Sequence, residues 1–284
     1  WKRLSAVYAS KIREIPFTVT AHAFDLFAKP ANEFAAEIIT AANRVVAVTE
    51  YNRDFIKDDL RVSTPVDVVP ACIRIGSFEP SEGGESKRVL SIGRLVEKKG
   101  FEYAIDAVAR LQDAHPDLEY HIIGTGQRKQ FLKSRIKKHG LEDSVQILGN
   151  VTDARLRQEL KEAELFILPC VIAADGDRDA APVALKEAMA MRVPCISTKV
   201  SGVPEMMTDG EDGIIVEPRN DTELAKEIDS IICDRHKQKR ISEQAYDRVS
   251  EQYSIENRIS DLEDVFQLAQ NRTREGRLIA LEYR

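Results

Sequence analysis

The sequence of 284 residues lacks any apolar stretch that approaches the length of a membrane span, and it shows no signal peptide. Its four cysteines, Cys72, Cys170, Cys195 and Cys233, are widely spaced and lie mostly in apolar runs. That spacing argues against a disulfide framework and against a zinc site. Together these absences predict a cytoplasmic protein with reduced core thiols.

The sequence also lacks an excess of positive charge, internal repeats and low-complexity segments. A net charge of −6 argues against a nucleic-acid-binding protein, although it does not exclude local basic patches. The length is sufficient for two domains, and 43% hydrophobic residues can fill a sizeable core. Because the chain begins at Trp1 within apparently structured sequence, we expect it to be a fragment.

Strand and helix patterns alternate along the chain, which predicts an α/β protein with parallel sheets. Residues 1–76 resemble the later half of one α/β domain, and the polar residues 77–87 have the composition of a linker. A second α/β domain is expected over residues 88–252, followed by a helix within 253–270 and an uninformative charged tail, 271–284. The expected strands are 17–21, 45–48, 66–69, 88–93, 119–123, 145–148, 165–169 and 194–198, and the expected helices are 32–42, 50–59, 101–114, 127–139, 153–163, 182–191, 203–207, 223–233, 238–252 and 255–270.

The acidic loop before the helix at 182–191 is the most informative stretch. We expect Pro182 at the first helical position, which leaves Ala181 at the cap without a side-chain oxygen for the free N–H groups. Either an external anion such as a phosphate binds this terminus, or Asp179 caps it, and local physics does not separate the two. A calcium-binding loop is excluded, because Ala180 and Lys186 occupy the positions of its glycine and closing glutamate.

Four further features could bind an anion or face the same ligand. Gly93 to Gly100 follows the first strand of the second domain, where Arg94 and Lys99 could clamp a diphosphate. Taken alone, Gly124-Thr125-Gly126 is better explained as a plain turn than as a dinucleotide fingerprint, and His22 is more often a structural histidine than a group that faces a ligand. The basic helix 127–139 could touch anionic lipid, although a solvated face is the more common explanation.

In combination, these motifs closely resemble the retaining GT-B glycosyltransferases of the group 1 family (family 4). The resemblance is carried by Gly93-Arg94-Leu95-Val96-x-x-Lys99-Gly100, by Asp179 and Glu187 eight positions apart, by Ser201-Gly202-Val203-Pro204-Glu205, and by Gly210-x-x-Gly213-Ile214-Ile215-Val216. It implies two facing Rossmann-like domains, the N-terminal one only partly present, with a nucleotide-diphosphate sugar held mainly by the C-terminal domain. The terminal helix is implied to cross back to the first domain.

The resemblance also implies roles for individual residues. Arg94 and Lys99 would neutralise the diphosphate, Glu187 would hold the ribose, and Asp179 would contact donor-sugar hydroxyls. Backbone amides at Ala181 and Val183 would meet the sugar-phosphate, and Val151 would border the base. His22 would face the transferring sugar. The implied catalytic set is His22, Arg94, Lys99, Asp179 and Glu187, and the implied donor-binding set is Gly93, Arg94, Lys99, Gly124, Val151, Asp179, Ala181, Val183 and Glu187.

Five departures from the family pattern are visible. Asp179 replaces a glutamate, Ala180 and Arg192 replace glycines, and Ala71-Cys72-Ile73-Arg74 replaces Asn-Gly-Ile-Asp. The glycine-rich loop that opens the family's first domain is absent.

The sequence therefore predicts a retaining hexosyltransferase that needs neither metal nor cofactor and serves surface polysaccharide assembly. Its expected partners are a nucleotide sugar and a glycan or lipid-linked acceptor, with a peripheral contact to the inner face of the membrane as a further option. The fragment itself is expected to bind nucleotide but to transfer little sugar. The alternatives are a non-catalytic nucleotide-sugar-binding subunit and a nicotinamide-dependent oxidoreductase, against which the incomplete glycine fingerprint argues.

Overall fold

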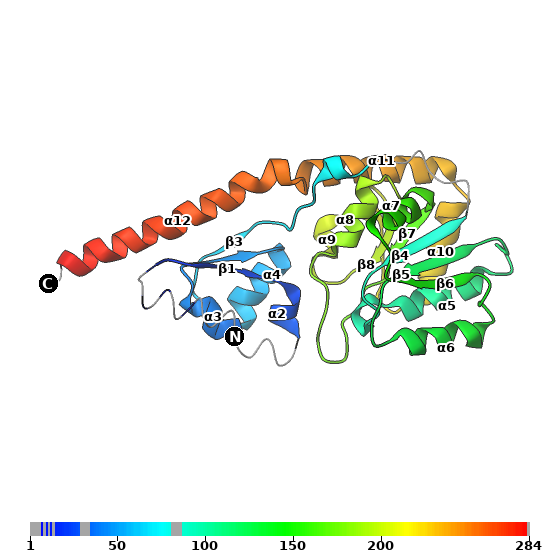
Figure 1. The fold of residues 1–284 in the computed structure, drawn as a ribbon, viewed down its shortest axis with the longest axis horizontal. Helices are drawn as coiled ribbons and strands as arrows, with labels where there is room; N and C mark the ends of the chain where they lie inside the picture. The colour runs from blue at the N-terminus through cyan, green and yellow to red at the C-terminus, as the bar shows by residue number, and fades with distance from the viewer. Residues whose placement is uncertain are drawn as a thin grey trace.

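The computed structural model describes residues 7, 10, 12, 15–28, 35–80 and 87–282, with the backbone alone for 272–282. The expected helix start at residues 32–34 and most of the expected linker, residues 81–86, lie outside the described residues. The chain forms two parallel α/β lobes, and the last helix runs from the C-terminal lobe past the N-terminal sheet (Figure 1).

The C-terminal lobe contains a six-stranded parallel sheet in the order β6-β5-β4-β7-β8-β9. Its strands are β4 (Arg88–Ile92), β5 (Glu119–Ile123), β6 (Val145–Gly149), β7 (Leu165–Leu168), β8 (Cys195–Thr198) and β9 (Ile214–Val216). Counted from β4, this is the doubly wound order 3-2-1-4-5-6, in which the winding reverses between β4 and β7. Ligands bind at the carboxyl ends of the strands at such a reversal, and this directs attention to the loops that follow β4 and β7.

Helices cover both faces of this sheet. They are α5 (Phe101–Leu111), α6 (Lys129–His139), α7 (Asp153–Glu162), α8 (Val183–Ala190), α9 (Val203–Met206), α10 (Asp221–Ile232) and α11 (Arg235–Gln252). α5 and α10 pack together against one face, whereas α8 and α11 pack together on the other.

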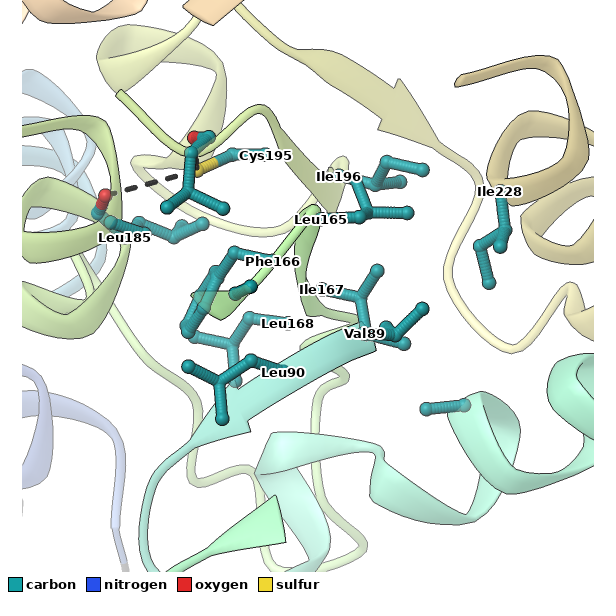
Figure 2. Packing of buried hydrophobic residues seen from close by; sticks show 14 of the residues in the cluster. Val89, Leu90, Leu165, Phe166, Ile167, Leu168, Leu185, Cys195, Ile196 and Ile228 are labelled. Atoms are coloured by element: carbon teal, nitrogen blue, oxygen red, sulfur yellow. Dashed lines mark hydrogen bonds between the residues drawn. The ribbon is translucent and has the colours of Figure 1, made fainter. Parts of the chain in front are cut away.

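Successive side chains of β7 point to opposite faces of the sheet and so reach both helix layers. Ile167 points toward Ile228 of α10, while Phe166 and Leu168 point to the side of Leu185 on α8 (Figure 2). All five side chains are fully buried, and this fixes the register of β7 in the sheet.

Short polar residues start several helices by accepting a backbone N–H. Thr152 accepts from Arg155 at the start of α7, Asn220 from Glu223 at α10, and Asp234 from Lys237 at α11. Such caps satisfy donors that have no partner within the helix. The helix boundaries therefore follow local sequence closely.

The N-terminal lobe contains a three-stranded parallel sheet in the order β1-β2-β3 within the described residues. Its strands are β1 (Thr18–Ala21), β2 (Arg44–Ala47) and β3 (Val66–Val68), and its helices are α2 (Ala23–Phe27), α3 (Ala35–Ala41) and α4 (Glu50–Asp54), which continues as a π-helical turn (Phe55–Asp59). A separate apolar core joins these elements, with Leu26, Val45 and Ile56 fully buried.

Two segments connect the lobes side by side. The N–H of Ile73 donates to the carbonyl of Tyr253, and the N–H of Ile255 donates to the carbonyl of Ile73. Lys186 of α8 lies at this junction, fully buried, with Nζ 2.5 Å from the Ala71 carbonyl and 4.8 Å from the Tyr253 ring centroid. Lys186 thus links α8 to both segments that connect the lobes.

Helix α12 (Ile255–Glu282) is longer than expected, because residues up to Glu282 continue the helix that the sequence analysis ended at residue 270. It contacts β2, and its residues Val265 and Leu268 line a groove with Val66–Val69. The charged sequence after 270 carries no proline, and the helix continues through its one glycine, Gly276, so composition alone was a poor guide to its structure.

No helix in the described part of the chain combines the length and the apolar character needed to cross a bilayer. All four cysteines are free, as predicted; Cys170 and Cys195 are buried, Cys72 is half-buried and Cys233 is exposed.

Candidate active site

Two loops meet at the point where the sheet order reverses. One follows β4 and contains Arg94, Lys98 and Lys99; the other follows β7 and contains the acidic residues. The N–H of Val171 donates to the Lys98 carbonyl at 2.9 Å, which joins the loops through their backbones. The site is therefore built on the edge of the sheet that binds ligands in doubly wound folds.

The acidic loop is held by two lysines. Lys99 Nζ lies 2.5 Å from Asp179 Oδ2, and Lys98 Nζ lies 3.3 Å from Asp179 Oδ1 and 2.9 Å from Asp177 Oδ1. Both lysines belong to a short 3₁₀ turn (Glu97–Lys99) and are buried. Each oxygen of the Asp179 carboxylate thus has a lysine partner.

These contacts decide between the two explanations of the open helix terminus. The carboxylate of Asp179 bonds to lysines, and no side chain caps the first turn of α8. The alternative in which Asp179 caps the helix is therefore wrong. The prediction that Pro182 is the first helical residue is also wrong by one position, because Pro182 is the N-cap and the helix begins at Val183. A proline offers no side-chain acceptor either, so the N-terminus of α8 stays open to an anion.

Burial and pairing set the protonation of this cluster. Burial alone would raise the pKa of Asp179, but the lysines Lys99 and Lys98 overcome it and hold that pKa below its ordinary value. Burial likewise opposes the charge on Lys99, and the Asp179 carboxylate more than offsets it, so the pKa of Lys99 is raised. The pair is ionised at neutral pH.

Glu187 and Arg94 differ from this pair. Glu187 lies one turn into α8, half-buried, and burial raises the pKa of its carboxyl group. Arg94 is exposed. Within the described residues neither side chain has an ion-pair partner. They are the available acceptor and the available cation of the site.

The remaining predicted residues are placed as follows. Gly93 and Gly124 lie in adjoining turns after β4 and β5, so close that a Cβ built on Gly124 would be 1.9 Å from the Gly93 carbonyl oxygen. Val151 follows β6 and packs against the core of the lobe. Ala181 is half-buried and Val183 is exposed at the open terminus of α8.

His22 lies in the other lobe. It directly follows β1 as the N-cap residue of α2, is exposed, and its backbone N–H donates to Asp25 Oδ2 at 3.1 Å. No contact between described residues brings its ring to Lys99 or Asp179. Its role toward the sugar remains a prediction.

Sequence reasoning missed three residues at this site: Lys98 and Asp177, which form the second ion pair, and Arg178, which reaches the N-terminal lobe. The alternation of charge in Asp175-Gly176-Asp177-Arg178-Asp179 was a signal, because neighbours in an extended loop point to opposite sides.

Two parallel α/β lobes with a lysine–carboxylate site at the sheet reversal define a GT-B architecture. Residues 76–248 match the family Glycosyl transferases group 1, and this chain belongs to that family. This membership removes the support for a nicotinamide-dependent oxidoreductase.

Relatives agree with this placement. The amylovoran biosynthesis glycosyltransferase AmsK of Erwinia amylovora is 40% identical over 141 residues, which cover 50% of this chain and 34% of AmsK. The match thus spans about a third of that relative's length.

Solved structures show the same fold. HepE of Anabaena in complex with UDP-glucose superposes with a TM-score of 0.82 at 20% identity, covering 93% of this chain and 76% of HepE. The C-terminal domain of LpcC, a glycosyl transferase group 1 family protein of Francisella tularensis, superposes with a TM-score of 0.54 at 23% identity, covering 64% of this chain and 99% of that domain.

Proposed function

We propose that this chain belongs to a retaining glycosyltransferase that moves a hexose from a nucleotide-diphosphate sugar to a glycan or lipid-linked acceptor in surface polysaccharide biosynthesis. Family membership and the likeness to AmsK, an amylovoran biosynthesis glycosyltransferase, support the reaction class and its context. The observation that carries the proposal is the open N-terminus of α8, which follows the loop held by Lys98 and Lys99.

The chemistry follows from the charges. Breaking the bond between the anomeric carbon and phosphate builds negative charge on the leaving diphosphate and positive character on the sugar. Arg94, Lys98 and Lys99 carry three positive charges against two on Asp177 and Asp179, and the helix terminus adds a partial positive charge. Fixed groups of this kind lower the barrier without reorganising.

The donor-sugar hydroxyls are the proposed partners of Asp179, and the ribose hydroxyls are those of Glu187. Both carboxylates are held on rigid elements, Asp179 by two lysines and Glu187 by the body of α8. His22 is proposed to face the transferring sugar from the N-terminal lobe.

A screen of nucleotide sugars by thermal shift identifies the donor, and proton NMR of the first-formed product then tests retention. We expect the anomeric configuration of the donor to persist in the product. An inverted product would contradict the proposal, and nucleotide-sugar binding without transfer to any acceptor would favour the non-catalytic subunit.

Metal independence is part of the proposal, since protein groups supply the positive charge at the diphosphate. We expect full activity in excess chelator. Activity lost in chelator and restored by magnesium or manganese would show that a cation shares this task.

We also propose that the enzyme acts at the cytoplasmic face of a membrane, through a peripheral contact of α6. Its Phe131 is exposed, but Arg128 and Arg135 are already paired with Glu102 and Asp106. Co-sedimentation with anionic vesicles tests this contact, and Lys133→Glu should abolish it if α6 is the surface involved.

A further inference from the structure

The acidic loop touches both lobes at once. Asp177 and Asp179 face Lys98 and Lys99 of the C-terminal lobe, whereas Arg178 between them faces the N-terminal lobe. Arg178 Nη1 donates to the Tyr51 hydroxyl at 2.7 Å, and its guanidinium carbon lies 4.4 Å from the centroid of the Phe27 ring. One residue therefore links the N-terminal lobe to the loop that carries Asp179.

The surface that receives Arg178 is formed by packed aromatic rings. The Phe27 ring is buried and packs on Phe55 with ring centroids 4.8 Å apart, and it meets Tyr51 at 5.8 Å. Tyr51 is itself held from the C-terminal lobe, because its backbone N–H donates to Glu205 Oε1 at 2.8 Å. An aromatic face with a hydroxyl at its rim suits the flat guanidinium of an arginine.

Glu205 makes a second contact between the lobes. Its carboxylate accepts from the N–H groups of both Glu50 and Tyr51 at 2.8 Å, at the start of α4. Close approach here requires Gly202, since a Cβ on it would lie 2.5 Å from Thr49 Cγ2. α8 and α9 lie on the side of their lobe that faces the N-terminal sheet (Figure 1). Glu205 lies on α9, outside the acidic loop, and so provides a matched control.

Arg178 also fixes the shape of its own loop. Its Nε donates to the Gly176 carbonyl at 3.2 Å, while the N–H of Asp177 donates to Asp175 Oδ1 at 2.9 Å. The same side chain thus orders the turn and anchors it to the other lobe. A displacement of the N-terminal lobe would pull on the residue next to Asp179.

We propose that Arg178 is a positioning residue that makes donor-sugar binding depend on the contact between the lobes, by holding the loop in which Asp179 meets the sugar. The inference rests on the proposed function for the identity of the ligand. Coupling of this kind is reciprocal, so the sugar moiety in turn stabilises the contact between the lobes.

The first measurement needs no ligand. Hydrogen exchange of the backbone amides of residues 176–181 is compared between the wild type, Arg178→Met, Tyr51→Phe and Glu205→Gln. We expect Arg178→Met and Tyr51→Phe to speed exchange in this loop clearly more than Glu205→Gln does, because Glu205 reaches the loop only indirectly, through the backbone of Tyr51. Equal acceleration in all three variants would show that the loop responds to general loosening, which overturns the proposal.

The second measurement is calorimetry of the same variants with a nucleotide sugar and with the bare nucleoside diphosphate. Because a charge-assisted hydrogen bond is lost, we expect the affinity for the nucleotide sugar to fall about tenfold in Arg178→Met and about threefold in Tyr51→Phe. Affinity for the nucleoside diphosphate should stay within about twofold, because Arg94 and Lys99 are untouched. The double variant should be no weaker than Arg178→Met alone.

Equal losses for both ligands would mean that Arg178 binds the diphosphate directly, and additive losses would mean that Tyr51 acts elsewhere; either result overturns the inference. If no nucleotide sugar binds the wild type, the proposed function fails, and the exchange measurement still reports whether Arg178 anchors the loop. Tyr51→Phe removes only the hydroxyl oxygen from a packed ring. The proposal therefore remains testable even if Arg178→Met does not fold.

Discussion

At the scale of single residues, the two carboxylates of the site stand in opposite electrostatic states. Asp179 is paired with Lys98 and Lys99, which lower its pKa against burial, whereas burial raises the pKa of Glu187 and no described residue pairs with it. An unpaired half-buried carboxylate costs stability in the free protein. This cost is consistent with a group kept for a ligand.

Glu187→Gln should stabilise the ligand-free protein and weaken nucleotide binding. Because the folded pKa is raised, the ionised group destabilises the native state at pH 7, and this burden lessens as pH falls through that pKa. We expect a gain of about 1 kcal/mol in the free energy of unfolding at pH 7, as is typical when a strained functional group is removed. Urea titration at pH 7 and pH 5 measures it, and a variant less stable at pH 7 would contradict the reasoning.

Alanine substitutions should separate the two carboxylates. Glu187→Ala should weaken the bare nucleoside diphosphate by about 1.5–3 kcal/mol, one to two decades in affinity, because a charged acceptor for the ribose is lost. Asp179→Ala should spare that ligand, since Lys99 is released toward the diphosphate, and should weaken only the intact sugar donor. Calorimetry with both ligands decides it; equal losses in both variants would refute the division of roles.

At the scale of elements, the hydrophobic patterns predicted most strands and helices of the sheet well. Local signals suffice for α7, which Thr152 starts at the expected residue, and for β7, which is apolar on both faces because helices cover both (Figure 2). The starts of α10 and α11 were predicted two and three residues too late, because Asn220 and Asp234 cap these helices further upstream. The errors have physical causes too. Pro182 can serve at either of two adjacent positions, and a charged helix such as the end of α12 has no apolar stripe to mark it.

The partners of Asp179 could not be predicted by the same means. The spacing from Asp179 to Glu187 identified both residues, but which lysine approaches from another loop depends on how strands pair in space. Lys186 is the clearest case, because a lysine between Leu185 and Glu187 gives no sign that it is buried at the junction of the lobes. Only tertiary structure supplies that information.

Lys186 makes the junction sensitive to alkaline pH. Burial lowers its pKa from 10.5 to about 8, so at pH 7 the native state carries a buried charge. Between about pH 8 and pH 10.5 the folded protein has released this proton while the unfolded chain still binds it, and the free energy of unfolding rises with pH, by up to about 3 kcal/mol. In Lys186→Met this rise should be absent.

Melting temperatures of the wild type and Lys186→Met from pH 7 to pH 9.5 test this expectation. The difference between them should move in favour of the wild type as pH increases. Lys186→Arg, which keeps its charge throughout, is the matched control and should show no such trend. Parallel curves for wild type and Lys186→Met would mean that the Ala71 carbonyl and the Tyr253 ring stabilise the charged form enough to keep its pKa ordinary.

At the scale of the whole molecule, each lobe has its own apolar core, and besides the packing of α12 on the N-terminal sheet the contacts that join the lobes are largely polar. Arg178, Glu205 and Lys186 each bond to the N-terminal part of the chain from the C-terminal lobe. Ile73 belongs to the core of the C-terminal lobe although it precedes that lobe's first strand. The lobes can therefore separate without exposing a shared core, whereas a cut between Ile73 and β4 would damage the C-terminal one.

Nucleotide binding should accordingly be separable from transfer. Residues 70–254 retain the sheet, both loops of the site and the Ile73–Tyr253 pairing, and the C-terminal domain of LpcC, with the same fold, crystallised alone. A nucleoside diphosphate at 100 times its dissociation constant should stabilise this piece and residues 1–284 alike, by about 2.7 kcal/mol.

The intact sugar donor should bind the piece more weakly, since Tyr51 and Phe27 no longer hold Arg178. Transfer requires both substrates in reacting geometry, so we expect none from residues 70–254 and little from residues 1–284. Thermal shift and a coupled assay of nucleotide release, run on both proteins, test this. Acceptor-dependent turnover by residues 70–254 would show that the C-terminal lobe binds the acceptor as well.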